Sequence, residues 1–479
     1  VERLSDDSTR GSVFNTNKEG EREALLYRRV FLTNETKEIR LYGLEDEDIF
    51  RIVGDVDDGI LLRVIGGLDE DTFIDESQVR KPGKQTILYD AKNEERILNI
   101  GSETRQRFSK DPELNSYNRR ADDYEYNFGF FLPTIAINPD DGLLLGGMAQ
   151  YTTYGFKKSP YATKHMFSVD YALATSCMRF RYHGEYTDVL GKWDVLLDAQ
   201  FNTPLYAINF YGLGNETPNP EEELGKNYNR VRQRLVSVEP ALLRRANEAF
   251  SWSIGPTFES IRIDSTEGRF IEEFTSVYDP ELFDGLEFLG VHFNMNLHNV
   301  DNPAFPTQGV GANLDLGWKQ QLDNRDKSFP YLKASFSLYQ HIVPSGNLVF
   351  ATRAGVWHNF NNDFEFFQGA TLGGNPMQEA NFRGLRRDRY TGKTAFYNNI
   401  DLRWNMVSSE NSTLPFSLGI YGGFDHGRVW VDGEDSDRWH YAYGGGLFFA
   451  PFDLASVSVG LFRGDEQQTR FTLSGGFFF

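Results

Sequence analysis

An arginine and an aspartate in the last quarter of the chain have the residue types of a charge-assisted pair. Arg383 is followed by Gly384 in a stretch rich in Gly, Asn and Arg, and Asp425 lies two residues before Gly427 in a strand-like stretch. A guanidinium and a carboxylate form strong, often bidentate hydrogen bonds. An arginine removed from water needs such a partner, because desolvation of a lone charge is costly. Two interpretations stay open: a pair joining loop to strand, or a hydrated loop arginine beside an unrelated carboxylate.

Two acidic phrases near the N-terminus have the residue types of a calcium site. They run from Gly43 to Phe50 and from Gly66 to Phe73, and resemble the glycine-aspartate repeat of calcium-binding β-rolls. Aspartate offers hard oxygen ligands, and the candidates are Asp48, Asp69 and Asp71. Only two copies are present, whereas a continuous core needs about three stacked repeats. We expect acidic turns between strands, with calcium as the alternative and no other cofactor.

The other reactive residues form no pattern that favours an enzyme. Residues 54–59 match one fragment of metallophosphoesterase signatures, but no Asp-x-His precedes them and no Gly-Asn-His-Asp follows. A two-metal site needs convergent histidine and carboxylate ligands. The single cysteine, Cys177, excludes an internal disulfide and is interpreted as structural. The net charge of -20 argues against nucleic acid as a partner. We expect no enzyme activity in this chain.

The elements that must position Arg383 and Asp425 are strands. From about residue 124 onward, apolar and polar residues alternate over stretches such as Leu289–His298 and Val310–Lys319. A tilted strand crosses a bilayer in about 9 to 11 residues, whereas strands of globular proteins run about 5 or 6. No run approaches the roughly 18 to 20 apolar residues of a membrane helix. Aromatic residues make up 15% of the chain, which suits the girdles of a membrane barrel.

The alternating stretches predict an all-β fold: a sixteen-stranded transmembrane antiparallel barrel preceded by a small β-rich domain. An even number lets the first and last strands meet antiparallel without an exposed edge. Outer-membrane lipid is therefore an expected partner, and the bacterial outer membrane the expected location. The predicted strands start near Tyr126, Leu143, His165, Met178, Trp193, Val231, Phe250, Phe288, Gly309, Tyr331, Leu348, Lys393, Pro415, Tyr441, Ala455 and Gln468.

Two domains are expected, because 479 residues exceed what one ordinary core supports. Residues 1–123 form the acidic β-rich domain, whose stretch from Glu103 to Asp123 lacks periodicity and is expected to be a linker. Residues 124–479 form the barrel. The chain opens at Val1 without the pattern of a secretory signal, so any signal is expected to have been removed or to lie outside this sequence.

The first and last barrel strands are expected to form a weakly paired seam. Pro133 lies in the first strand and lacks the N–H that a ladder needs. The last strand ends in a Phe-Phe-Phe sequence, with Phe477 and Phe479 on the face that carries Phe471 and Leu473. This pattern resembles the C-terminal signal by which outer-membrane barrels are recognised.

Several phrases together resemble the BamA-type superfamily of outer-membrane assembly and translocation barrels, the bacterial surface antigen family. They are Phe382-Arg383-Gly384-Leu385, Phe424-Asp425-His426-Gly427-Arg428-Val429-Trp430, Asn209–Asn215, Asn302–Gly309 and the terminal Phe. The resemblance implies that Arg383 contacts Asp425 and holds the sixth outer loop inside the lumen. It covers residues 124–479. Phe382 and Leu385 depart from the family, which more often has Val and an aromatic residue there.

Residues 1–123 depart from the helix-containing POTRA modules of that family. They look like the β-domain that joins a calcineurin-like phosphoesterase to such a barrel in fusion proteins of Bacteroidota. That resemblance implies a phosphoesterase domain upstream of Val1. The function expected is insertion, translocation or surface display of protein, with client polypeptides or other assembly proteins as partners. The alternatives are a passive outer-membrane pore and a membrane anchor for a calcium-dependent binding module.

Overall fold

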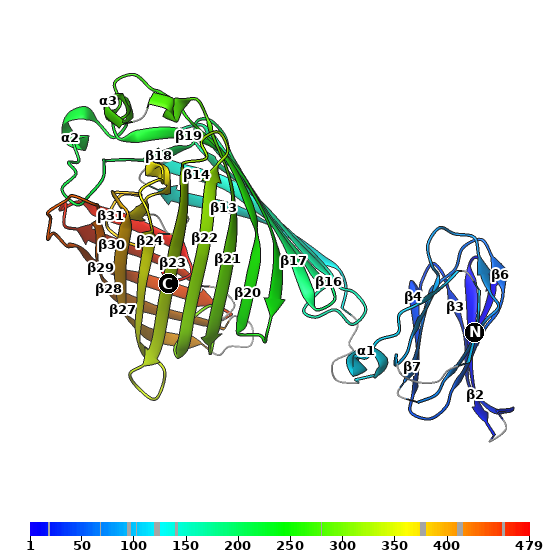
Figure 1. Cartoon of the computed structure of the whole chain (residues 1–479). Helices are drawn as coiled ribbons and strands as arrows, with labels where there is room; N and C mark the ends of the chain where they lie inside the picture. The colour runs from blue at the N-terminus through cyan, green and yellow to red at the C-terminus, as the bar shows by residue number, and fades with distance from the viewer. Residues whose placement is uncertain are drawn as a thin grey trace. The chain divides into compact units, whose positions relative to one another are not determined.

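The computed structural model describes the chain except for residues 18–19, 68, 93–96, 102, 119–124, 139–141, 279, 374–379, 410–414 and 453–455. It forms two units, Val1–Glu125 and Tyr126–Phe479, which are drawn in Figure 1. The domain boundary predicted between residues 123 and 124 lies outside the described residues.

Unit 1 is built from parallel strands stacked as successive coils. One ladder joins β4 to β7, β7 to β10 and β10 to β12, a second joins β5 to β8 and β8 to β11, and a third joins β6 to β9. Ile39 lies beside Leu62 in the first ladder, an offset of one coil. The strands are β4 (Glu38–Leu44), β5 (Ile49–Ile52), β6 (Asp55–Val56), β7 (Leu61–Gly67), β8 (Thr72–Asp75), β9 (Gln78–Val79), β10 (Thr86–Tyr89), β11 (Ile97–Ile100) and β12 (Thr104–Gln106).

The coils stack because apolar side chains recur at the same place in each. Leu62, Val64, Phe73 and Leu88 are at most 1% exposed and form one core. An antiparallel sheet of β1 (Glu2–Ser5), β2 (Ser8–Thr16) and β3 (Arg22–Leu32) precedes the coils. The predicted linker is not free of structure, because β12 pairs with β10 and α1 (Pro112–Asn115) follows it.

Unit 2 is an antiparallel sheet whose wall consists of sixteen strands of 7 to 16 residues, and the number of strands is as predicted. A short strand, β18 (Ala207–Asn209), pairs with β19 beyond the end of β17. The wall strands are β13 (Phe128–Asn138), β14 (Gly142–Thr153), β15 (Thr163–Ala172), β16 (Cys177–Leu190), β17 (Trp193–Asn202), β19 (Arg230–Arg245), β20 (Phe250–Ile263), β21 (Leu286–Val300), β22 (Gly309–Gln321), β23 (Ser328–His341), β24 (Leu348–Asn359), β27 (Thr394–Ser409), β28 (Phe416–Trp430), β29 (His440–Pro451), β30 (Val457–Gly464) and β31 (Thr469–Gly475).

Alternation along the wall strands separates an apolar outer face from a polar interior. In β23, Lys333 and Ser335 line a cavity of about 740 Å3 inside the barrel, whereas the adjacent Phe336 is 51% exposed on the outside. Large apolar side chains such as Trp318, Leu402 and Leu447 are also exposed. A contiguous exposed apolar belt is unfavourable in water and favourable in lipid.

The longest connections emerge at one end of the barrel, here named the long-loop end. They carry α2 (Glu221–Leu224), α3 (Phe270–Tyr278), η1 (Pro280–Phe283), η2 (Phe366–Gln368) and the hairpin of β25 (Ala370–Leu372) and β26 (Tyr390–Gly392) (Figure 1). The opposite end, the short-turn end, is where β13 begins and β31 finishes. Among the described residues, no helix is long and apolar enough to cross a membrane.

A pair of labels on β23 tests which face meets lipid. With the protein in liposomes, we expect a fluorophore on Phe336→Cys to be quenched by brominated lipid, because this side chain lies outside. The same fluorophore on Ser335→Cys is expected to escape quenching, because Ser335 faces the cavity. Equal quenching at both positions would contradict the assignment of the faces.

Candidate functional site

Arg383 is held between two carboxylates of the barrel wall. Its Nε and Nη2 donate to Oδ2 and Oδ1 of Asp425 at 2.9 and 2.6 Å, and its backbone N–H donates to Asp425 Oδ2 at 2.8 Å. Its Nη1 donates to Asp401 Oδ1 at 2.7 Å. The side chains of all three residues are at most 2% exposed. The loop between β24 and β27 is therefore fixed to the wall by a buried bidentate ion pair with a second acid.

The wall strands place these carboxylates through their alternation. Asp401 and Arg403 point inward from β27, and Arg403 Nη2 donates to Asp401 Oδ2 at 3.0 Å. Asp425 points inward from β28, where Gly423 leaves space for the guanidinium. A Cβ on Gly423 would lie 2.8 Å from both Arg383 Nη1 and Nη2. The four charged groups form two guanidinium–carboxylate pairs, which offsets the cost of burying them.

The two glycines predicted beside the charged pair allow neighbouring chain segments to approach each other closely. Gly384 has φ +74°, and a Cβ there would lie 2.9 Å from Ala442 Cβ and 3.0 Å from the Gly464 backbone nitrogen. A Cβ on Gly427 would lie 2.4 Å from the Phe396 carbonyl oxygen. The loop thus reaches the wall only because Gly384 adopts a conformation that L side chains rarely adopt.

The arginines that follow attach the loop to its neighbour between β17 and β19. Arg386 donates to Glu221, and Arg389 Nη2 donates to the Thr217 carbonyl oxygen at 2.7 Å. Asn209 Nδ2 donates to the Arg387 carbonyl oxygen at 3.1 Å. The inserted loop is thus anchored both to the wall and to the loop between β17 and β19.

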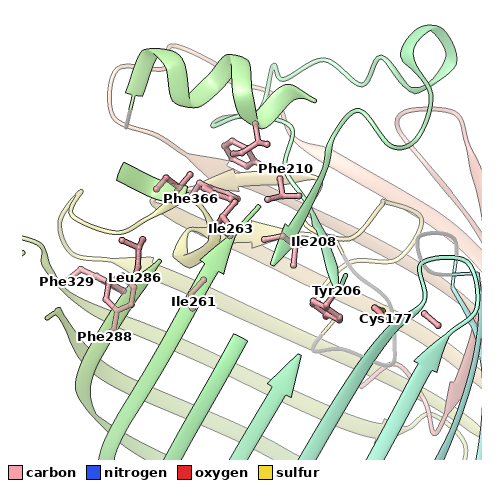
Figure 2. Close-up of a cluster of buried hydrophobic side chains, with 14 of the residues drawn as sticks. Cys177, Tyr206, Ile208, Phe210, Ile261, Ile263, Leu286, Phe288, Phe329 and Phe366 are labelled. Carbon is pink, nitrogen blue, oxygen red and sulfur yellow. The ribbon is translucent and has the colours of Figure 1, made fainter. Parts of the chain in front are cut away.

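A cluster of buried apolar side chains covers the interior at the long-loop end. Phe210, Ile263 and Phe288 are at most 2% exposed and come from three different segments. Figure 2 shows Phe210 and Phe366 close to each other, and their ring centroids are 4.5 Å apart. Ile271 of α3 joins the same cluster. The long loops therefore form a packed cap above the polar cavity.

The junction of β13 and β31, here named the seam, differs from every other junction in the wall. The two strands lie in contact, but no ladder of backbone hydrogen bonds joins them among the described residues, whereas all neighbouring wall strands pair. The ladder from β13 to β14 runs through the pair Pro133 and Gly147 without a register shift. The Leu143 carbonyl oxygen accepts from Leu173, so Leu143 and every second residue after it in β14, including Gly147, bond β15 rather than β13. The missing N–H of Pro133, the partner of Gly147, is therefore on the edge that faces the seam.

Phe477 and Phe479 do not lie on the face that carries Phe471 and Leu473, so this prediction for the last strand is wrong. Strand β31 ends at Gly475, and Gly476 has φ +106°, which turns the chain inward. Phe477 packs on Phe305 and Phe448 inside the barrel, with ring centroids 5.6 and 5.0 Å apart. Only residues before Gly475, such as Phe471, keep the outer face.

The inward-turned phenylalanines cover the buried charges. The Arg403 guanidinium lies 4.0 Å from the ring centroid of Phe477, and Arg383 lies 4.9 Å from that of Phe478. The Phe479 carbonyl oxygen accepts from Arg403 Nη2 at 2.8 Å. Cation–π contacts and burial together link the segment after β31 to the loop–wall ion pair.

The candidate calcium residues lie at turns between the strands of a coil in unit 1: Asp48 between β4 and β5, and Asp69 and Asp71 between β7 and β8. The Asp48 backbone N–H donates to Asp71 Oδ1 at 2.9 Å, and the Asp46 backbone N–H donates to Asp69 Oδ2 at 3.0 Å. Asp69 and Asp71 thus bond the preceding coil. Within the described residues, no group of three or more His, Cys, Asp or Glu side chains is arranged to hold a metal ion. Calcium remains a prediction.

The sequence reasoning missed Asp401, Arg403, Gly423 and the inward role of Phe477. One signal was available: Asn399, Asp401 and Arg403 alternate on one face of a predicted strand. Charged residues on the inner face at the level of an arginine-bearing loop predict partners for it. The turn at Gly475 and Gly476 carried only a weak signal, because glycines are common throughout this chain.

Comparison with solved structures shows the fold. The chain is similar to BamA from Haemophilus ducreyi lacking POTRA domains 1-3, at 14% identity and TM-score 0.52, covering 74% of this chain and 70% of that chain. It also matches CdiB from Escherichia coli (12% identity, TM-score 0.46, covering 78% and 64%) and CdiB from Acinetobacter baumannii (13%, 0.43, covering 73% and 60%). No protein-family model and no curated protein matches the chain.

The wall, the inserted loop and this likeness define the class of protein. The chain has the fold of a BamA-type outer-membrane β-barrel, as predicted from the sequence. Its exposed apolar belt fits the bacterial outer membrane, where such barrels lie. The predicted phosphoesterase domain upstream stays a prediction.

We expect Arg383→Met to lower the free energy of unfolding by about 3–5 kcal/mol, because Asp425 is left as an uncompensated buried charge. Equilibrium unfolding in detergent, followed by tryptophan fluorescence, measures the loss. The double variant Arg383→Met/Asp425→Leu is expected to lose less than the sum of the single changes, since Asp401 keeps Arg403 as its partner. Additive losses would show that the pair is not coupled.

The pH dependence of unit 1 tests whether its aspartates hold a cation. Burial, aided by nearby Asp46, raises the pKa of Asp48 above its ordinary value. The folded state then binds this proton more tightly than the unfolded state, so ionised Asp48 opposes folding as pH rises. At pH 7 we expect Asp48→Asn to raise the calorimetric Tm of unit 1, with the gain disappearing in acid. A lowered Tm, reproduced by a chelator in the wild type, would instead support bound calcium.

Proposed function

We propose that this barrel inserts or translocates client polypeptides at the outer membrane through the seam. One observation carries the proposal: among the described residues, β13 and β31 lie in contact without a backbone ladder. Opening any other junction of the wall would break a run of hydrogen bonds in a medium that offers no replacement. The seam is the junction that opens at the smallest cost.

The packed cap supports a lateral path rather than an axial one. The long loops pack Phe210 and Phe366 against Phe288 of the wall, over the cavity, and the ion pair of Arg383 with Asp425 holds the inserted loop in place. A polypeptide that entered at the short-turn end would meet this cap. The remaining exit from the interior is sideways, between β13 and β31.

The topology also favours clients that arrive from the periplasm. Outer-membrane barrels have short periplasmic turns and longer outer loops, and β13 begins at the short-turn end of this barrel. The start of β13 therefore belongs on the periplasmic side. In this proposal the barrel itself is no enzyme, and its partners are outer-membrane lipid and client polypeptides. Display of a fused upstream domain would use the same route.

An added hydrogen-bond donor at the seam is expected to slow the insertion of client polypeptides by the barrel. We expect Pro133→Val to reduce the rate at which the protein, in liposomes, folds a urea-denatured eight-stranded barrel into the bilayer. The new N–H would face the seam and strengthen its closure. The measurement is the heat-modifiable shift of the client on a gel. Ile135→Val, which leaves the number of donors unchanged, is the matched control.

An unchanged rate with Pro133→Val would contradict the seam mechanism. A wild-type protein that folds no client but conducts ions steadily in a planar bilayer would support a passive pore instead. The capped interior is expected to conduct poorly until the loop is released by Arg383→Ala.

A further inference from the structure

The inner face of the first wall strand is apolar at the short-turn end. In the register with β14, Phe131 pairs with Ala149 and Ile135 with Leu145, which lie on the outer face. The residues between them alternate inward, so Phe128, Phe130 and Leu132 face the lumen. They are 59, 38 and 50% exposed. Three large apolar side chains thus lie exposed on the inner side of the wall.

The large apolar side chains Phe448 and Phe462, on the inner face of other wall strands, are at most 1% exposed, whereas those of β13 are not covered. Inner positions on other strands that line the cavity carry Arg179, Asn313, Asp315 and Lys333, as expected for a polar lumen. The inner face of β13 returns to that pattern at Thr134. The apolar inner strip therefore spans only Phe128 to Leu132, and both faces of β13 are apolar there.

The barrel's own inward-turned phenylalanines do not cover this strip. Phe477 packs on Phe305, Tyr421 and Phe448, and Phe478 lies over Arg383. Within the described residues, Phe128 and Phe130 make ring contact with each other and with no other aromatic side chain. The strip and the edge of β13 without a ladder partner lie on the same five residues.

We propose that this part of β13 receives an extended client segment that is apolar on both faces, rather than one that alternates. The inference rests on the proposed function and specifies its substrate. Side chains directly opposite on paired strands lie about 4.5–5.5 Å apart on each face. A polar residue opposite Phe130 would lose water without gaining a hydrogen bond, whereas an apolar residue there buries area on both strands.

The space at the seam selects a single segment as the occupant. Strands β13 and β31 are in contact, so the gap that opens between them admits one strand before it admits a folded body. A second copy of the barrel would have to bring its neighbouring wall strands with it. The segment recognised is short, because Phe128 to Leu132 is followed by the inward Thr134, where an alternating sequence fits again.

Peptide cross-linking to the full chain in nanodiscs tests this. A photoreactive side chain at Thr134, just beyond the strip, reports strands that pair with β13. Two synthetic peptides of the same length and amino-acid composition are compared. One carries its apolar residues consecutively at the centre, and the other alternates them with serine. We expect the first to be captured on the order of tenfold more efficiently, which corresponds to about 1.4 kcal/mol.

The inner-face variants Phe130→Ser and Phe128→Ser are expected to remove this preference. Phe131→Ser on the outer face is the matched control and is expected to weaken both peptides equally. Retained heat-modifiable mobility shows that each variant is folded. Phe128→Ser is the milder change, because Phe128 is the first residue of β13.

Equal capture of the two peptides by wild type would overturn this inference and leave the proposed function standing. Capture of neither peptide by the folded protein would overturn the seam mechanism itself. Cross-links between two copies of the chain would overturn the choice of a client segment and assign the strip to a dimer.

Discussion

One buried guanidinium constrains the interior of this barrel. Arg383 is 2% exposed, and a charge so removed from water is stable only where carboxylates meet it with good geometry. Asp425 and Asp401 meet that need from two adjacent strands, and Gly423 leaves the space. The loop between β24 and β27 therefore has one position in the lumen. Because that loop also holds its neighbour through Arg386 and Arg389, the cap at the long-loop end depends on the same charge.

The wall could be predicted from the sequence because every strand of a membrane barrel is subject to the same two constraints. A strand between lipid and a watery interior must alternate, and its length must match the bilayer. All sixteen predicted starts fall within a few residues of the observed strands, from Trp193 and Phe250, which match, to Tyr331, which falls three residues late. The pairing of Arg383 with Asp425 followed from chemistry and resemblance. The second acid, Asp401, did not, because its role depends on where the loop settles across neighbouring strands.

Features that depend on the conformation of a single residue could not be predicted from the sequence. Alternation continued past Gly475 in the prediction, yet φ +106° at Gly476 redirects Phe477 into the lumen. In unit 1, the sequence shows two glycine-aspartate phrases but not the coil to which they belong. The third coil lacks the phrase, and what it shares with the others is an inward apolar residue, Leu88 above Val64. A repeat maintained by burial rather than by turn residues leaves little trace in a motif search.

The seam and the ion pair are physically connected rather than two separate devices. The segment after β31 places Phe477 over Arg403 and Phe478 over Arg383, so the last strand reaches the charges that fix the loop. Moving β31 away from β13 would draw these rings off the guanidinium groups and admit water to a site that was dry. Water weakens the attraction between the buried charges but also lowers the cost of their burial, so the two changes partly cancel. The loop could then stay paired with Asp425 while the seam opens, which lets the wall part without releasing the cap.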